Sequence, residues 1–254
     1  MRFGLCCSLD RLPVAAAAGA DYVEPAVNST GNPDVPRGAW RVSLARLHDA
    51  GIAPEAWNCL LPGDLMVAGP EADLKRLQCY VNAVAPRLDE AGARVVVFGS
   101  GASRTAPDGF PLADGRAQFA EAVSIVAEAL APAGILVCVE PLRPAETNVI
   151  NTLAEGVAFV RALAIPNVRL TADLYHMESA GDPIDLASAA PFIGHAHLAD
   201  SGRLAPRAGS TAIPAFLAEL QRIGYSERIS IECRWIDFDR EAAPALAFLR
   251  ERAA

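Results

Sequence analysis

Four polar side chains stand at the ends of short apolar runs in the second half of the chain: Glu140, Asp173, His197 and Glu232. Each run is rich in Val, Ile, Leu or Ala, which is typical of a buried strand. A carboxylate or an imidazole beside a buried strand needs a partner, because an isolated charge is costly to remove from water. Taken singly, each of the four could cap a helix or pair with an arginine.

Taken together, the same four side chains predict a metal site. Three carboxylates that meet in a folded protein repel one another strongly where the dielectric is low. With a neutral imidazole their charges sum to −3, and a cation of charge +2 reduces this sum to −1. Ligands that are mostly oxygen favour Mn²⁺ or Mg²⁺, with Co²⁺ as a further candidate, over a cysteine-rich zinc site.

The segments that must position these residues alternate between two types. Short apolar runs are each followed by an Ala/Leu-rich stretch of helical spacing, which predicts repeated βα units. The expected strands are 2–6, 21–24, 53–59, 94–99, 135–140, 168–173, 193–197 and 228–232. The expected helices are 12–18, 36–50, 71–91, 116–131, 153–163, 186–190, 211–223 and 239–252.

Eight βα units predict an α/β fold, a (β/α)₈ TIM barrel in which residues 1–254 form one domain. Closure pairs every strand edge and places the carboxyl ends of neighbouring strands five to eight side by side at one rim. The alternative is a doubly wound open sheet, which would need a phosphate-binding glycine loop. Gly99-Ser100-Gly101 does not continue as G-x-G-x-x-G into a helix, so the barrel is favoured.

Strand alternation gives a further expectation for the barrel interior. The residues two positions before the four candidate ligands should face inward, one layer below them. These residues are small or polar, where a purely structural barrel would more often have Val, Ile or Leu: Cys138, Thr171, His195 and Ser230. For His195 we consider three roles: a substrate contact or donor near the site, an interior histidine hydrogen-bonded to a neighbouring strand, and the metal ligand itself in place of His197.

Composition excludes several classes of partner. The chain has 22 basic and 30 acidic residues, a net charge of −8, and no basic run, so nucleic acid and anionic membranes are not expected partners. Six cysteines without C-x-x-C spacing and the absence of a signal sequence predict a cytoplasmic protein. No charge-free apolar run approaches the ~18 residues of a membrane span.

Four segments carry a resemblance to a known family. They are Glu140-Pro-Leu-Arg-Pro-Ala-Glu146-Thr-Asn148, Asp173-Leu-Tyr-His176, Gly194-His195-Ala-His197 with Arg203 six residues later, and Ser230-Ile-Glu232. In this order they resemble motifs of the xylose-isomerase-like TIM-barrel family of sugar isomerases and epimerases, and above all its ketose 3-epimerase branch, the D-tagatose and D-psicose 3-epimerases. The loops 61–65 and 98–104 are also similar, whereas Arg143-Pro144-Ala145 and Cys233-Arg234-Trp235 depart from the branch's pattern.

The resemblance implies a role for each matched residue. Glu140, Asp173, His197 and Glu232 would be ligands of a divalent metal, Mn²⁺ first, and Glu140 and Glu232 would also be the acid and base of catalysis. The residues that the resemblance predicts to contact the substrate are Glu146, His176 and Arg203. His195, considered above from strand alternation, is a further candidate for a substrate contact. The implied reaction is C3 epimerisation of a ketose through an enediolate, with a small sugar as the partner.

Other functions remain open on the same residues. One is a 1,2 aldose–ketose, hydroxypyruvate or inosose isomerase. A metal-dependent endonuclease would need several zinc ions and a basic groove, whereas the chain has four histidines and a charge of −8. A non-catalytic sugar-binding barrel would be marked by the loss of a ligand, and all four are present. The sequence leaves a monomer and a homo-oligomer equally open.

Overall fold

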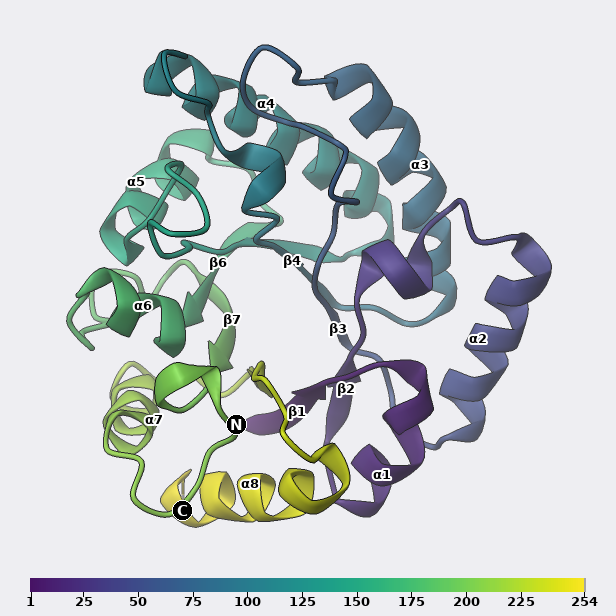
Figure 1. Cartoon of the computed structure of the whole chain (residues 1–254), viewed down its shortest axis with the longest axis vertical. Coiled ribbons are helices and arrows are strands. Elements are labelled where there is room, and N and C mark those ends of the chain that lie inside the picture. The colour runs from purple at the N-terminus through teal and green to yellow at the C-terminus, as the bar shows by residue number, and fades with distance from the viewer. Residues whose placement is uncertain (254) are drawn as a thin grey trace.

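A ring of eight parallel strands surrounded by helices forms the framework of the protein (Figure 1). This computed structural model describes residues 1–253. The strands are β1 (Arg2–Cys6), β2 (Tyr22–Glu24), β3 (Ala56–Trp57), β4 (Val95–Phe98), β5 (Leu136–Val139), β6 (Val168–Asp173), β7 (Ile193–Leu198) and β8 (Arg228–Ile231). The predicted (β/α)₈ barrel is therefore confirmed.

The order of the strands around the ring is β2-β1-β8-β7-β6-β5-β4-β3. The ring closes between β2 and β3 through looser contacts, an isolated bridge between Ala26 and Asn58 and a hydrogen bond of 3.0 Å from the Val23 amide to the Ala53 carbonyl. Strands β5 to β8 are consecutive neighbours in this order. Their carboxyl ends therefore share one arc of the rim, which is where the four candidate ligands stand.

The helices cover the outside of the ring (Figure 1). They are α1 (Leu12–Ala17), α2 (Arg37–Asp49), α3 (Leu74–Glu90), α4 (Leu112–Leu130), α5 (Leu153–Leu163), α6 (Leu174–Ala180), α7 (Ala212–Arg222) and α8 (Phe238–Ala253). Thr152 begins α5 with a reciprocal capping box to Glu155, which satisfies amide groups that a helix start would otherwise leave unpaired. Among residues 1–253, no helix combines the length and the apolar character needed to cross a membrane.

One predicted helix is wrong. Residues 186–190 form turns, and the helix that follows β6 is α6, which begins directly after Asp173. The Asp173 side chain accepts the His176 amide at 3.0 Å and so caps this helix. Gly181 ends α6 in the left-handed conformation, and Pro183 follows it. The helix that begins at Leu174 was not predicted, because Asp173 both ends β6 and caps α6, so the sequence shows no loop between the two elements.

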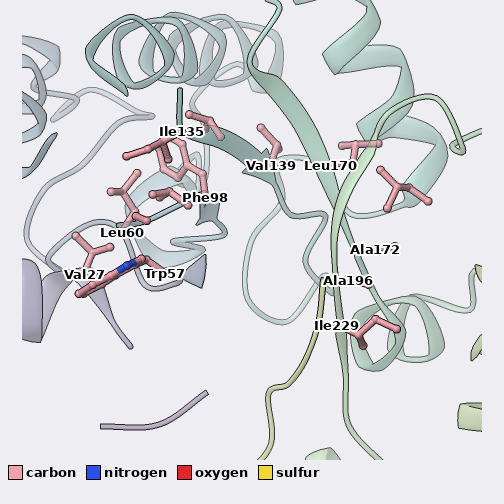
Figure 2. Close-up of a cluster of buried hydrophobic side chains, with 14 of the residues drawn as sticks. Val27, Trp57, Leu60, Phe98, Ile135, Val139, Leu170, Ala172, Ala196 and Ile229 are labelled. Carbon is pink, nitrogen blue, oxygen red and sulfur yellow. The ribbon is translucent and has the colours of Figure 1, made fainter. Parts of the chain in front are cut away.

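The buried hydrophobic side chains form two sets, one on the outer face of the strands and one inside the ring. The larger set lies between the strands and the helices, and Figure 2 labels part of it: Val27, Trp57, Leu60, Phe98, Ile135, Val139, Leu170, Ala172, Ala196 and Ile229. The smaller set has the opposite strand alternation and fills the ring: Tyr22, Ala56, Val95, Val97 and Cys138. A Cβ at Gly4 would lie 2.4 Å from the Tyr22 ring, so Gly4 makes the room that Tyr22 needs.

Candidate metal centre and substrate cavity

The four predicted ligands meet at the rim. Glu140, Asp173, His197 and Glu232 each offer a donor atom, and these atoms lie within 4.8 Å of one another. His197 Nδ1 lies among the three carboxylates, 3.0 Å from Glu140 Oε1, 3.7 Å from Asp173 Oδ2 and 3.7 Å from Glu232 Oε2. The strands of the second half of the barrel thus bring together residues that are up to 92 positions apart, Glu140 and Glu232 (232 − 140).

This cluster has an excess of negative charge. Burial, together with repulsion from Glu232, raises the pKa of Asp173 to about 6. Burial and the neighbouring carboxylates likewise raise the pKa of Glu140. Burial opposes the charged form of His197, but Glu24, Glu232 and Glu140 outweigh it and raise the pKa of that imidazole well above its usual value. The surroundings therefore favour a proton or a cation at the centre of the cluster.

The residues present fit a divalent cation. Three carboxylates and one imidazole nitrogen supply mostly hard oxygen donors, which suit Mn²⁺, Mg²⁺ or Co²⁺. Arg203 contacts Glu232 Oε2, the oxygen that also lies 3.7 Å from His197 Nδ1, and so offsets part of the negative charge at one edge of the cluster. Chemistry of the donors and their mutual repulsion both point to a metal-binding cluster.

A cavity of about 330 Å³ lies over the cluster. Glu140 and Glu232 line it from the cluster, and three residues predicted to contact substrate line it as well: Glu146, His176 and Arg203. The loops after β3 and β4 complete the wall with Asn58, Cys59, Leu61, Gly63 and residues 99–103. Both loops had been singled out in the sequence by their resemblance to family loops.

His176 presents a hydrogen-bond donor toward this cavity. Its Nδ1 accepts the Arg143 amide at 3.2 Å, so in the neutral ring the proton resides on Nε2. That Nε2 atom is buried and has no partner among residues 1–253. Burial lowers the pKa of His176, which favours the neutral ring. His176 therefore combines a place in the cavity wall with a buried Nε2–H group that has no partner among residues 1–253.

Arg203 and Glu146 lie in a charged network at the mouth of the cavity. Arg203 Nη2 contacts Glu232 Oε2 at 2.5 Å, and Arg203 Nη1 is 3.7 Å from Glu146 Oε1. Arg143, which departs from the pattern of the ketose 3-epimerase branch, donates to the same Glu146 oxygen at 2.8 Å. Tyr175 packs under both guanidinium groups. The departure at Arg143 thus adds a second positive charge beside Glu146.

His195, the fourth residue considered for substrate contact, lies in the interior of the barrel beside Glu24. It is fully buried, does not line the cavity, and its Nε2 is 2.9 Å from Glu24 Oε2. His195 is thus an interior histidine, but its partner Glu24 is on β2, across the ring from β7, and the neighbouring strand β8 contributes the longer contact of 3.4 Å from Ser230 Oγ. The expected inward layer is seen at Cys138, which belongs to the set of side chains that fills the ring, and at Ser230, which contacts Tyr22 of the same set.

Two residues that contact the candidate ligands were not predicted from the sequence, Glu24 and Asn58. Glu24, at the end of β2, is buried against His195 and His197. Its signal was available, because Glu24-Pro25 ends a strand just as Glu140-Pro141 does. Asn58 donates to Glu232 Oε1 at 3.3 Å, and no feature of its sequence distinguishes it.

Arg104 donates a hydrogen bond to the backbone at the carboxyl end of β5. It is fully buried, its Nη2 donates to the Glu140 carbonyl at 2.6 Å, and its guanidinium lies 4.8 Å from the centre of the Phe119 ring. Burial lowers the pKa of Arg104 to about 10. The charge of this arginine therefore lies next to the backbone of Glu140, whose side chain belongs to the cluster.

Gly99 allows Glu140 its position. A Cβ at Gly99 would lie 2.5 Å from Glu140 Oε2. We expect Gly99→Ala to displace this carboxylate while the fold survives, because the displaced atom ends a flexible side chain. Mn²⁺ affinity measured by calorimetric titration should fall by about tenfold or more, the size of effect seen when the support of a ligand is lost. Gly38→Ala, where a Cβ meets nothing within 4 Å, is the control; equal affinities in the two variants would contradict this prediction.

The fold and the site together define a (β/α)₈ barrel with a candidate metal centre at the carboxyl end of β5 to β8. A family model described as Xylose isomerase-like TIM barrel matches residues 12–252. The chain belongs to this family.

Individual relatives agree with the assignment. The D-psicose 3-epimerase of Agrobacterium fabrum is 34% identical over 120 residues, which are 46% of this chain and 41% of that one. The 3-dehydro-D-guloside 4-epimerase of Escherichia coli is 28% identical over 123 residues, 47% of this chain and 46% of that one. The chain thus matches less than half the length of these two relatives. A solved structure of D-psicose 3-epimerase with D-tagatose, from Clostridium cellulolyticum H10, superposes with a TM-score of 0.87 at 22% identity, covering 100% of this chain and 99% of that one.

Proposed function

We propose that the protein is a divalent-metal-dependent sugar epimerase that inverts C3 of a ketose. The observation that carries this proposal is the pair Glu140 and Glu232, two carboxylates that line one cavity and share one candidate metal centre. Similarity to a D-psicose 3-epimerase and to an L-ribulose 3-epimerase supports the reaction and the ketose substrate.

Glu140, Asp173, His197 and Glu232 would hold the metal, with Mn²⁺ as the first candidate and Mg²⁺ or Co²⁺ as alternatives. When bound, the cation supplies positive charge that makes the C–H group beside the sugar carbonyl more acidic. The remaining chemistry belongs to side chains of this protein.

Glu140 and Glu232 would act as the acid and the base. They belong to strand ends three places apart in the ring, with Asp173 and His197 between them, and so reach the cavity from different directions. One carboxylate oxygen takes the proton from C3, and the other glutamate returns a proton to the opposite face of the flattened carbon. Arg203 and Asn58 hold Glu232 by hydrogen bonds to its two oxygens, which keeps that carboxylate oriented toward the cavity.

The hydroxyl groups of the sugar would be bound by three side chains. His176 Nε2–H and the Arg203 guanidinium donate to sugar oxygens and stabilise negative charge that develops during proton transfer. Glu146 accepts from hydroxyl groups, held between Arg143 and Arg203. The cavity of about 330 Å³ lies at the lower end of the ~300–1,000 Å³ of small-molecule sites, which suits a monosaccharide. His195 does not line the cavity and contacts Glu24, so the proposal gives it no contact with the sugar.

The position of proton exchange distinguishes this reaction from its competitors. Purified protein loaded with Mn²⁺ is incubated in D₂O with D-psicose, D-tagatose and L-ribulose, and the sugars are analysed by NMR. We expect deuterium at C3 together with the C3 epimer. Deuterium at C1 or C2 would instead indicate aldose–ketose isomerisation. The similarity to a 3-dehydro-D-guloside 4-epimerase makes exchange at C4 of a keto sugar the second candidate. If none of the three sugars exchanges a proton for deuterium, the proposal is contradicted.

The setting of the protein follows from the same features. All six cysteines are free, which supports a reducing, cytoplasmic location. The charge of −8 argues against a nucleic-acid substrate and therefore against an endonuclease. A small sugar is the partner that the cavity suits.

A further inference from the structure

Glu24 is a buried carboxylate beside the candidate metal centre that the proposed reaction does not use. It ends β2, is 1% exposed, and accepts hydrogen bonds from side chains of β7 and β8 inside the ring. His195 Nε2 lies 2.9 Å from one of its oxygens and His197 Nε2 lies 2.9 Å from the other. Ser230 Oγ also donates to Glu24 and lies 2.8 Å from the Tyr22 hydroxyl.

The contacts of Glu24 determine where its two histidines carry their protons. Each oxygen of Glu24 lies 2.9 Å from an imidazole nitrogen, and Ser230 Oγ donates to one of the two as well, so both oxygens are placed as acceptors. An ionised carboxylate only accepts hydrogen bonds, so the ring nitrogens that face it must donate. His195 agrees, because its Nδ1 has no partner among residues 1–253 and is better left as a lone pair than as a buried N–H group.

For His197 the same reasoning has a consequence for the metal site. With its proton on Nε2 and directed at Glu24, the neutral ring keeps a lone pair on Nδ1. This nitrogen is the atom that lies 3.0 Å from Glu140 Oε1 and within 3.7 Å of oxygens of Asp173 and Glu232. A lone pair facing carboxylate oxygens at these distances requires a cation or a proton between them.

We propose that Glu24 is a positioning residue of the metal centre, which holds His197 in the tautomer that presents Nδ1 to the metal and strengthens that nitrogen as a ligand. This inference rests on the metal-dependent function proposed above. A carboxylate that accepts the second N–H group of a ligating histidine orients the ring and raises its basicity. Loss of such a partner weakens metal binding by about 10- to 100-fold.

Cys6 does not compete for this role. Its thiol lies within 4.8 Å of donor atoms of Glu24 and His197. Burial, with the nearby Glu24, raises the pKa of the Cys6 thiol well above its usual value. Both oxygens of Glu24 already lie at hydrogen-bond distance from the imidazoles of His195 and His197, so Glu24 acts in this cluster as the support of His197.

The test compares Mn²⁺ affinity, measured by calorimetric titration of metal-free protein, in wild type, Glu24→Gln and Tyr22→Phe. Glutamine keeps the size of the side chain and one acceptor oxygen but removes the charge, so we expect an affinity about 10- to 100-fold weaker. Tyr22→Phe removes a hydroxyl from the other end of the same buried network without touching His197, and we expect its affinity to stay close to that of wild type.

The outcomes separate the inference from the proposed function. Wild-type affinity in Glu24→Gln, or an equal loss in Tyr22→Phe, would overturn the role of Glu24 and leave the metal site intact. Failure of the wild-type protein to bind Mn²⁺ would overturn the proposed function and this role with it. If Glu24→Gln does not fold, as judged by circular dichroism, Glu24→Asp replaces it. Aspartate keeps the charge but is one methylene too short to hold both imidazoles, so an unchanged affinity in that variant would also overturn the inference.

Discussion

Replacement of Glu140 or Glu232 by glutamine is expected to lower kcat for ketose epimerisation by about 10²- to 10⁴-fold, the range of a lost acid or base. Glutamine preserves the shape of the side chain but can neither take a proton from carbon nor return one. One glutamate takes the proton from C3 and the other returns a proton to the opposite face. Each variant therefore lacks one of the two proton transfers, and both should lose epimerisation. Rates are measured by conversion between the two epimers at saturating Mn²⁺, because both residues are also predicted ligands.

The fold should survive both changes, since each carboxylate lies at the rim of a barrel whose core is built elsewhere. Melting curves of the two variants are compared with those of Glu121→Gln, an exposed position on α4 that lacks any contact with the cavity. Activity within about tenfold of wild type in Glu140→Gln or in Glu232→Gln would remove that residue from acid–base catalysis.

Removal of divalent metal by a chelator is expected to abolish turnover and to lower the melting temperature. The metal-free cluster confines three carboxylates within 4.8 Å of one another, whereas a bound cation offsets their repulsion. Any ligand that binds only the folded state stabilises it, by about 2.7 kcal/mol when its concentration is 100 times Kd. Addition of Mn²⁺ or Co²⁺ should restore both the activity and the melting temperature.

Asp173→Asn is the matched control for this measurement, because it removes a predicted ligand that is not a predicted acid or base. In that variant, Mn²⁺ should raise the melting temperature much less than in wild type. Full activity of the chelated wild-type protein would contradict the metal site, as would an equal stabilisation of wild type and Asp173→Asn by Mn²⁺.

Local patterns in the sequence predicted the barrel architecture and the four candidate ligands that meet at its rim. The apolar runs at 168–173 and 228–232 predict β6 and β8 almost residue for residue, because buried parallel strands need continuous apolar side chains. The polar residue at the end of each run then marks the rim. Boundaries were less accurate where pairing is weak. For example, the strand expected at 53–59 is regular only over Ala56–Trp57, because its neighbour β2 contacts it through an isolated bridge and a few single hydrogen bonds.

The surroundings of the ligands depended on ring closure, which no local pattern encodes. Glu24 and His197 are 173 positions apart and meet only because β2 and β7 face each other across the interior of the ring. His195 and the candidate ligand His197 differ by two positions and point to the same side of β7, yet only His197 meets the three carboxylates of the candidate metal centre, whereas His195 meets Glu24 alone among the carboxylates of the described residues. Alternation along a strand tells which face a side chain occupies, but its depth below the rim and its partner across the barrel follow from how eight strands tilt and close, and that is a property of the whole chain.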